Sequence, residues 1–204
     1  MKIAVFGGTF DPVHTGHTGP GRFLLQAGLA EKVLYLPAWL PPHKGEKKVT
    51  PYVHRRAMLA LALDPEMAIS DLEEERAGKS YTIDTLKILT ERFPSDSFFW
   101  TVGADGLRNL HLWHRADELV RDYSFLVLPR PGEVMPDRAE LSKHWPEERI
   151  GRLLSFIVDG APLFPGSSTE IRRAIACGGT EKVKGLLEPA VLAYIQEHKL
   201  YQKE

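Results

Sequence analysis

The chain contains a single cysteine, no long apolar run and almost no excess of either charge. Cys177 stands alone, so no disulfide can form within the chain. The first apolar run is broken by Gly7 and Gly8 and is too short for a signal peptide, and no run approaches the roughly twenty residues of a membrane span. A net charge of -1 offers no attraction to nucleic acid or to an anionic membrane. We therefore expect an intracellular, cytoplasmic protein with neither partner.

The length and composition are those of an ordinary globular protein. The chain has 204 residues, of which 43% are hydrophobic and 26% charged, enough for one substantial core. We find no internal repeat, so we predict a single domain over residues 1–204. The segment 131–149 is rich in Pro, Glu and Arg and has no clean period, and we predict a surface insertion there.

Short apolar runs alternate with helical stretches along the chain. This pattern predicts an α/β fold, a parallel sheet with helices on both faces and a C-terminal helical segment from about residue 168. Ligands of such sheets bind beyond the carboxyl ends of the strands. The predicted strands are 3–6, 32–36, 67–72, 97–102, 123–128 and 153–158. The first predicted helix ends near residue 27, and the second covers 50–63, with Thr50 as N-cap and Pro51 at N1. Another helix is predicted over 82–93. Helices also fill the C-terminal segment, and the last of them opens at Glu188-Pro189.

The segment GGTFDPVHTGH, from Gly7 to His17, directly follows the first predicted strand. Glycines let backbone N–H groups approach an anion, and a helix N-terminus adds partial positive charge. His14 and His17 would lie on one face of the first helical turn. A glycine-rich turn with incidental histidines, a zinc site and a dinucleotide-binding loop are the alternatives. No G-x-G-x-x-G and no second cluster of zinc ligands occur, so we favour a phosphate site.

Two further segments carry cationic or hydroxyl groups suited to phosphates. Pro41-Pro42-His43-Lys44 follows the second strand, and its prolines stiffen a loop that is either solvated or in contact with phosphate; we favour contact. Ser168 and Thr169 open a C-terminal helix, with Arg172 one turn further on. In one interpretation they cap the helix, with Ser168 or Thr169 at the N-cap. In the other they bind a triphosphate, and the two roles are compatible.

Several residues are suited to binding a nucleotide, and two of them, Asp105 and Trp113, follow the fourth strand. Asp105 can accept hydrogen bonds from two ribose hydroxyls. Trp113 either stacks on a heteroaromatic ring or holds its helix on the sheet as a half-buried aromatic. Tyr81 and Thr82 precede a helix, where they are capping residues or offer backbone N–H groups to a ligand carboxylate.

Together these motifs resemble one family, the bacterial nicotinate-nucleotide adenylyltransferases of the HxGH nucleotidylyltransferase superfamily. The similarity extends over nearly the whole chain, in the order GGTFDPVHTGH, PPHK, SYTIDTL, VGADGLRNLHLWHR, LPRPG, SSTEIRRAI and PAVLAYIQEHKLY. It implies a Rossmann-like fold. It also implies the reaction of ATP with nicotinate mononucleotide to give nicotinate adenine dinucleotide and pyrophosphate, a step in NAD biosynthesis.

The resemblance also implies roles for individual residues. The catalytic residues would be His14, His17, Lys44 and Arg172. ATP would contact Gly7, Gly8, Thr9, Phe10, His14, His17, Gly103, Asp105, Ser168, Thr169 and Arg172. Nicotinate mononucleotide would contact Thr9, His43, Lys44, Tyr81, Thr82, Asp105, Trp113 and Arg130. Mg²⁺ would be held mainly by the ATP phosphates, so we expect no metal-ligating residues.

The chemistry fits these residues, because a phosphate monoester nucleophile is mostly dianionic at pH 7 and needs no base. Two positions depart from the family pattern. Thr18-Gly19-Pro20-Gly21 predicts an irregular first turn, and His114 stands where an aromatic such as Tyr is common. Alternatives are a related transferase for nicotinamide mononucleotide or phosphopantetheine, and a nucleotide-binding regulatory module without turnover. A homo-oligomer is compatible with the sequence.

Overall fold

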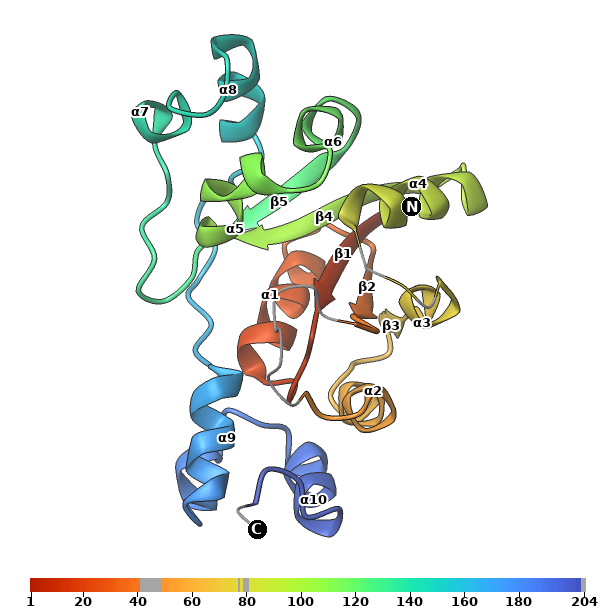
Figure 1. The fold of residues 1–204 in the computed structure, drawn as a ribbon, viewed down its shortest axis with the longest axis vertical. Helices are drawn as coiled ribbons and strands as arrows, with labels where there is room; N and C mark the ends of the chain where they lie inside the picture. Colours follow the sequence, from red (N-terminus) through yellow and green to blue (C-terminus); the bar gives the residue numbers. More distant parts are fainter. Residues whose placement is uncertain (41–48, 77, 79–80, 203–204) are drawn as a thin grey trace.

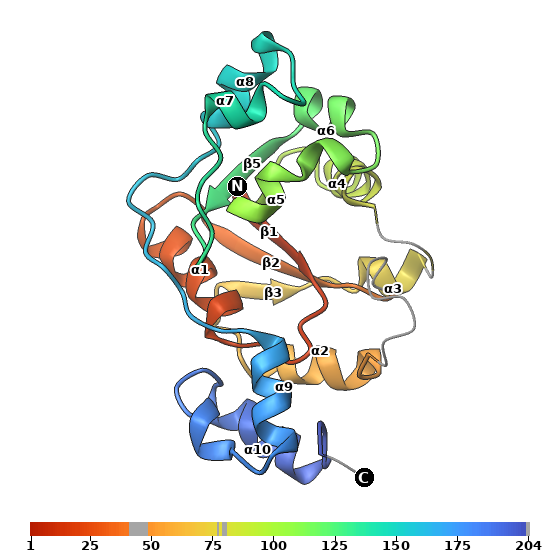
Figure 2. The ribbon, with the colours of Figure 1, turned by 60° about the vertical axis from the view of Figure 1, so that its left-hand side comes forward.

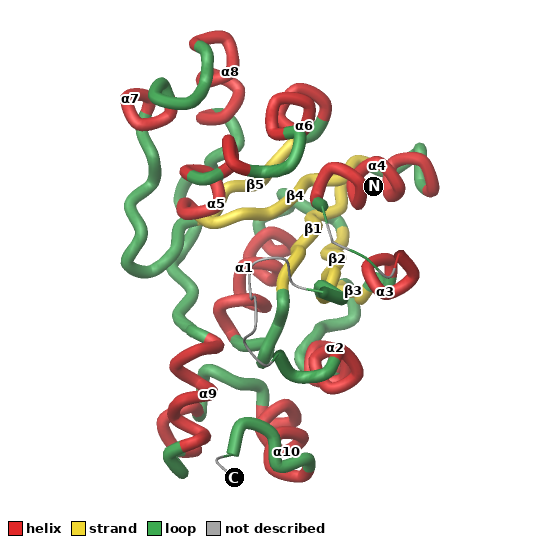
Figure 3. Tube along the Cα trace, viewed as in Figure 1, coloured by secondary structure: helices red, strands yellow, loops and turns green. Residues whose placement is uncertain are grey.

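A parallel β-sheet forms the centre of the protein. The computed structural model describes residues 1–40, 49–76, 78 and 81–202. Within them, five strands pair in the order β3-β2-β1-β4-β5, and every pairing is parallel (Figure 3). The strands are β1 (Lys2–Gly8), β2 (Lys32–Pro37), β3 (Met67–Ile69), β4 (Ser97–Gly103) and β5 (Ser124–Leu128). The predicted α/β fold of the Rossmann-like type is confirmed.

Helices follow the strands and surround the sheet (Figure 1). The α-helices are α1 (Thr15–Gln26), α2 (Tyr52–Ala60), α3 (Leu72–Arg76), α4 (Thr82–Arg92), α5 (Ala104–Arg108), α6 (Ala116–Asp122), α7 (Arg138–Leu141), α8 (Glu147–Leu154), α9 (Ser168–Ala176) and α10 (Pro189–Glu197). Two 3-10 helices, η1 (Leu110–Leu112) and η2 (Thr180–Val183), complete the elements of the described residues. No helix in this part of the chain is long and apolar enough to cross a membrane.

The central strand separates two hydrophobic clusters. Successive side chains of a strand point to opposite faces, and β1 accordingly places Ile3 and Val5 in one cluster and Ala4 in the other. The first cluster includes buried residues of α4, α5, α6 and α8, and the second those of α1, α2, α9 and α10 (Figure 2). Burial of apolar surface on both faces is what holds the layers together.

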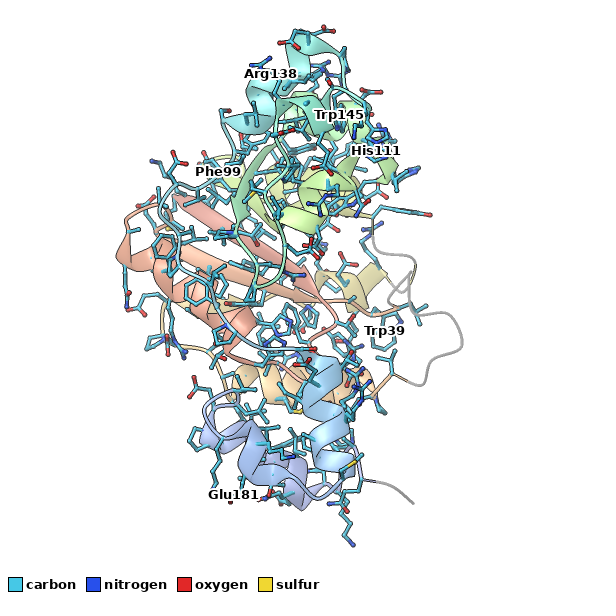
Figure 4. All side chains as sticks on the ribbon, turned by 90° about the vertical axis from the view of Figure 1, so that its left-hand side faces the viewer. Trp39, Phe99, His111, Arg138, Trp145 and Glu181 are labelled. Carbon is cyan, nitrogen blue, oxygen red and sulfur yellow. The ribbon has the colours of Figure 1, made fainter. Side chains whose placement is uncertain are left out.

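Two pairs of helices lie beyond the ends of the sheet. Helices α7 and α8 occupy one end of the long axis, and α9 and α10 the other (Figure 1). Figure 4 shows Trp145 near the first end and Glu181 near the second. Trp145 and Leu141 come from the segment 131–149, and both are buried in the first hydrophobic cluster. These two side chains anchor a segment that is otherwise mostly exposed, and its status as an insertion of a single domain stays a prediction.

The predicted sixth strand, 153–158, is wrong. Helix α8 extends to Leu154, and beyond it Ile157 forms only an isolated parallel bridge with Val127. Two hydrogen bonds make this bridge, from Val127 N–H to the carbonyl of Phe156 (2.8 Å) and from Val158 N–H to that of Val127 (2.9 Å). A short apolar run does not distinguish a strand from a buried helix end. Here the burial of Ile150 and Leu153, three positions apart, favours the helix.

Several element boundaries also differ from the predictions. Helix α2 begins at Tyr52 with Pro51, not Thr50, at its N-cap, and β3 ends at Ile69, three residues early. Helix α9 is capped by Ser167, whose hydroxyl accepts from the Glu170 N–H (3.4 Å), and neither Ser168 nor Thr169 is the cap. The physical reason is that Ser168 is already inside the helix, with its hydroxyl donating elsewhere.

Helix α1 is continuous from Thr15 through Pro20, so the predicted irregular first turn does not interrupt it. The glycines of this helix lie where neighbours come very close. A Cβ on Gly19 would lie 2.4 Å from the Phe164 ring, and one on Gly21 would lie 2.6 Å from the Tyr35 hydroxyl. The same hydroxyl donates to the carbonyl of His17 (3.1 Å). Tight packing of α1 therefore requires residues that are poor helix formers.

Candidate active site

A cavity of about 590 Å³ opens at the carboxyl ends of β1 and β4. These strands are neighbours in the sheet but not in the chain, and such switch points are where open α/β sheets bind ligands. The residues that line the cavity come from the ends of β1, β2 and β4, from α3 and α4, and from the segment around η1. The lining residues are Gly7, Gly8, Thr9, Leu36, Ala38, Glu73, Tyr81, Thr82, Thr85, Trp100, Thr101, Val102, Gly103, Asp105, Gly106, Asn109, Leu112, Trp113, His114 and Arg130.

Two of the predicted glycines are required by close contacts inside the cavity. A Cβ on Gly7 would lie 2.4 Å from the Trp100 ring. A Cβ on Gly103 would lie 2.6 Å from Arg130 Cδ and equally close to Asp105 Oδ1. The glycines thus make room at the strand ends for the side chains of Trp100, Arg130 and Asp105.

Asp105 and Arg130 form an ion pair at the end of β4. Arg130 Nη1 lies 3.2 Å from Asp105 Oδ2, and both side chains are partly exposed. The other carboxylate oxygen of Asp105, Oδ1, is buried and has no hydrogen-bond partner in the structure. A buried acceptor without a donor costs free energy. Asp105 also lines the cavity, so its carboxylate is an acceptor at the cavity wall.

An aromatic and backbone surface forms the other side of the cavity. Trp113 is half-buried and packs against the first hydrophobic cluster while it lines the cavity. Tyr81 and His114 face each other with ring centroids 4.3 Å apart. Thr82 begins α4, and the first N–H groups of a helix have no partner within it. A flat ring with a carboxylate could lie between these groups.

Glu73 and Thr85 line the same side and were missed by the sequence analysis. Glu73 is only 4% exposed, and its Oε1 accepts from the Thr85 hydroxyl at 2.6 Å. Burial raises the pKa of Glu73, while Thr85 and Arg76 lower it less. Glu73 belongs to a run of three glutamates, a pattern typical of a solvated helix face, so no local signal marked it.

The two motif histidines stand together at the start of α1. Their ring centroids are 3.8 Å apart, and the backbone N–H of His14 donates to His17 Nδ1 (3.2 Å). An accepting Nδ1 leaves the proton of a neutral His17 on Nε2. Burial, followed by the positive charge of Arg130, lowers the pKa of His14 to about 4, so His14 is neutral at pH 7.

The start of α9 is tied to the loop that precedes α1. Arg172 Nη1 donates to the carbonyl of Asp11 (2.5 Å), and the Ser168 hydroxyl donates to that of Pro12 (3.0 Å). Arg172 Nη2 also reaches Thr169 Oγ1 (3.3 Å). The fold thus brings residues some 160 positions apart to the loop just before the histidines.

The predicted site residues fall into two groups. Those that line the cavity are Gly7, Gly8, Thr9, Tyr81, Thr82, Gly103, Asp105, Trp113 and Arg130. Those gathered at the starts of α1 and α9 are His14, His17, Ser168, Thr169 and Arg172. Arg130 links the groups, since it lines the cavity and its charge reaches His14.

Three predicted residues are not placed in either group, one because of its burial and two because the structure does not describe them. The Phe10 ring is buried in the second hydrophobic cluster, edge-on to His17 at 5.1 Å, so only its backbone is left for a ligand. His43 and Lys44 lie outside the described residues. No group of three or more His, Cys, Asp or Glu side chains that could hold a metal ion occurs in the described part of the chain.

Comparisons with known proteins agree with the motifs. Residues 5–174 match the model of the cytidylyltransferase-like family. Relatives named "Probable nicotinate-nucleotide adenylyltransferase" include one from Solibacter usitatus, 38% identical over 98% of this chain and 100% of its own length. Another, from Neisseria meningitidis, is 39% identical over 99% of both chains.

Among solved structures, the fold is similar to that of a Plasmodium falciparum nicotinic acid mononucleotide adenylyltransferase complexed with NaAD. The TM-score is 0.76, with 20% identity over 98% of this chain and 97% of the other. At this identity the likeness concerns the fold. The sequence matches carry the family assignment: the chain belongs to the cytidylyltransferase-like family and, within it, to the nicotinate-nucleotide adenylyltransferases.

Proposed function

We propose that this protein transfers AMP from ATP to nicotinate mononucleotide, forming nicotinate adenine dinucleotide and pyrophosphate in NAD biosynthesis. A phosphate oxygen of the mononucleotide attacks the α-phosphorus of ATP, and the bond from that phosphorus to the bridging oxygen of pyrophosphate breaks. The observation that carries the proposal is the cavity at the β1–β4 switch point, which both Asp105 and Trp113 line.

On the ATP side, the proposed work is positioning and charge stabilisation. The backbone of Gly7, Gly8, Thr9 and Phe10 borders the nucleotide, with Gly103 and Asp105 at the end of β4. His17 donates from Nε2 to a phosphate oxygen, and His14, neutral because of its burial, polarises the same region. Ser168, Thr169 and Arg172 hold the β- and γ-phosphates at the start of α9. Such preorganised donors supply most of the acceleration in phosphoryl transfer.

On the acceptor side, the pyridine ring lies against Trp113. The nicotinate carboxylate meets the first N–H groups of α4 near Tyr81 and Thr82, where the helix dipole favours an anion. The Asp105 carboxylate accepts hydrogen bonds from ribose hydroxyls, and Arg130, its ion-pair partner, lies beside it for the phosphate. Thr9, His43 and Lys44 complete the proposed contacts, with Lys44 near the transferring phosphoryl group, on the strength of the sequence motif.

The proposed cofactor is Mg²⁺. The donor set fits an ion that arrives with its substrate, because the described residues around the histidines offer cations, hydroxyls and amides, and no acidic cluster. Mg²⁺ keeps several waters and is held mainly by substrate phosphates in such sites, where it neutralises developing charge.

The test is a substrate panel with the purified protein, ATP and Mg²⁺. Three acceptors are supplied separately: nicotinate mononucleotide, nicotinamide mononucleotide and phosphopantetheine. In each reaction we quantify pyrophosphate and the adenylylated product, which is a dinucleotide or, for phosphopantetheine, the dephospho-coenzyme. We expect equimolar pyrophosphate and nicotinate adenine dinucleotide, with the highest kcat/KM for nicotinate mononucleotide. Faster turnover of another acceptor would reassign the substrate, and tight ATP binding without pyrophosphate would indicate a regulatory module.

A further inference from the structure

Arg55, on α2, has a fully buried charged side chain that the proposed mechanism does not use. It is 1% exposed. Its guanidinium donates to three backbone carbonyls: Nε to Thr50 (2.9 Å), Nη1 to Thr9 (2.7 Å) and Nη2 to Ala38 (2.8 Å). Desolvating a guanidinium is costly, and these acceptors satisfy its planar fork of donors. Three separate loops thus converge on one side chain.

Two of the three acceptors belong to residues of the candidate site. Thr9 follows β1 and Ala38 follows β2, and both line the cavity. These loops are also joined directly, since the Ala38 N–H donates to the carbonyl of Gly8 (2.8 Å). The Tyr52 ring, 5.5 Å from Arg55 Cζ, closes one side of the guanidinium. The position of the cavity rim therefore depends on where the Arg55 fork is held.

Arg55 keeps its charge although it is buried, because a guanidinium is not deprotonated in proteins. Burial lowers its pKa, and the charge of Asp11 opposes this effect. Asp11 is itself buried and is held by the Thr50 N–H (3.4 Å) and the Tyr201 hydroxyl (2.7 Å). Hydrogen bonds from an ionised donor are about twice as strong as neutral ones. The three carbonyls are therefore held firmly.

We propose that Arg55 is a positioning residue for adenylyl transfer, which sets the spacing of the loops after β1 and β2 that border the substrates. The inference rests on the proposed function. Misplacement of reacting groups by about 1 Å can cost a hundredfold in rate. Loss of the fork is thus expected to lower kcat even in a fully folded protein.

The first test compares Arg55→Lys with Arg56→Lys. A lysine keeps the charge at position 55 but lacks the planar fork that reaches three carbonyls. Arg56 is the next residue of α2 and pairs with Asp71 at the surface, with 43% of its side chain exposed. Steady-state kinetics are measured at a temperature where circular dichroism shows each variant fully folded. We expect Arg55→Lys to lower kcat by about ten- to hundredfold, and Arg56→Lys to leave it near the wild-type value.

The second test is chemical rescue of Arg55→Ala by guanidinium chloride at low millimolar concentrations, well below the molar range that unfolds proteins. We expect turnover to recover in this variant and to stay unchanged in the wild type. A folded Arg55→Lys variant with wild-type kcat, or an Arg55→Ala variant that guanidinium does not restore, overturns the proposal. A wild type that forms no dinucleotide refutes the proposed function and, with it, this role, whereas an active wild type with an unaffected Arg55→Lys variant refutes this role alone.

Discussion

At the scale of single residues, His14 couples the site to the stability of the fold. Its pKa is lowered from 6.5 to about 4, chiefly by burial and then by Arg130. Between about pH 4 and pH 6.5, His14 therefore binds a proton in the unfolded chain but not in the folded protein. The stability from neutral His14 is fully present above about pH 6.5 and is lost as the pH falls towards 4.

This sign leads to a prediction for His14→Gln. A glutamine does not titrate, so the free energy of unfolding of the variant should fall less steeply between pH 7 and pH 4. The difference in loss is at most about 3 kcal/mol, from the size of the pKa shift. Urea unfolding at several pH values measures it, and parallel pH profiles for the two proteins would show that His14 titrates normally in the folded state.

Trp113 is the residue whose role in the acceptor site is easiest to separate from packing. A pyridinium ring should gain about 1 to 2 kcal/mol from a partly desolvated indole face. Trp113→Ala is therefore expected to raise the KM for nicotinate mononucleotide about tenfold and to change that for ATP little.

Trp113→Phe is the matched control, because it keeps a flat face in the same place, and its KM should rise less. Kinetics with each substrate varied in turn, beside thermal unfolding, distinguish the two roles. Equal rises in both KM values together with a lowered Tm would make Trp113 a packing residue that holds η1 on the sheet.

At the scale of elements, the start of α9 combines a structural cap with groups proposed to bind ATP. The cap is Ser167, and the hydroxyls proposed for phosphate follow it at Ser168 and Thr169. The capping role and the proposed ATP-binding role can be tested separately, because they belong to different residues of the same helix turn.

Ser167→Ala should lower the free energy of unfolding by about 0.5 to 2 kcal/mol, the usual cost of a lost N-cap. The KM for ATP should change little. Ser167→Asp restores an acceptor at the same position and should recover the stability, as measured by urea unfolding. If Ser167→Ala unfolds like the wild type, the hydrogen bond to Glu170 contributes nothing and the cap lies elsewhere.

At the scale of the whole molecule, the C-terminal segment contacts the loop between β1 and α1. The Tyr201 hydroxyl donates to Asp11 Oδ1 at 2.7 Å, across 190 positions of sequence. Burial and the charge of Asp11 raise the pKa of Tyr201, so it stays a donor at all ordinary pH values. Asp11 in turn presents its carbonyl to Arg172. Helix α9 and the segment after α10 thus support the loop that precedes the histidines.

Tyr201→Phe removes one donor and leaves a buried carboxylate less satisfied. We expect a loss of about 1 to 3 kcal/mol in the free energy of unfolding, the cost of an unmet buried acceptor. Tyr194→Phe, which removes a hydroxyl bonded to His54 in a part-buried place, is the control and should cost less. Chemical unfolding of both variants measures this, and equal losses would mean that Asp11 finds another donor.

The sequence by itself determined what depends on neighbours along the chain. Alternating apolar and helical segments predicted five of the strands and the parallel sheet, and Glu188-Pro189 marked the start of α10. The spacing of the motifs indicated the histidines, Asp105 and Trp113 as candidate site residues, because glycines and helix caps reflect local backbone geometry. Only the tertiary structure decided the rest. The fate of 153–158 depended on which neighbour its apolar side chains could reach, and a short run fits a helix or a strand. Glu73 and Arg55 gained their importance from burial beside residues remote in sequence, and burial of a charge is a property of the packed fold.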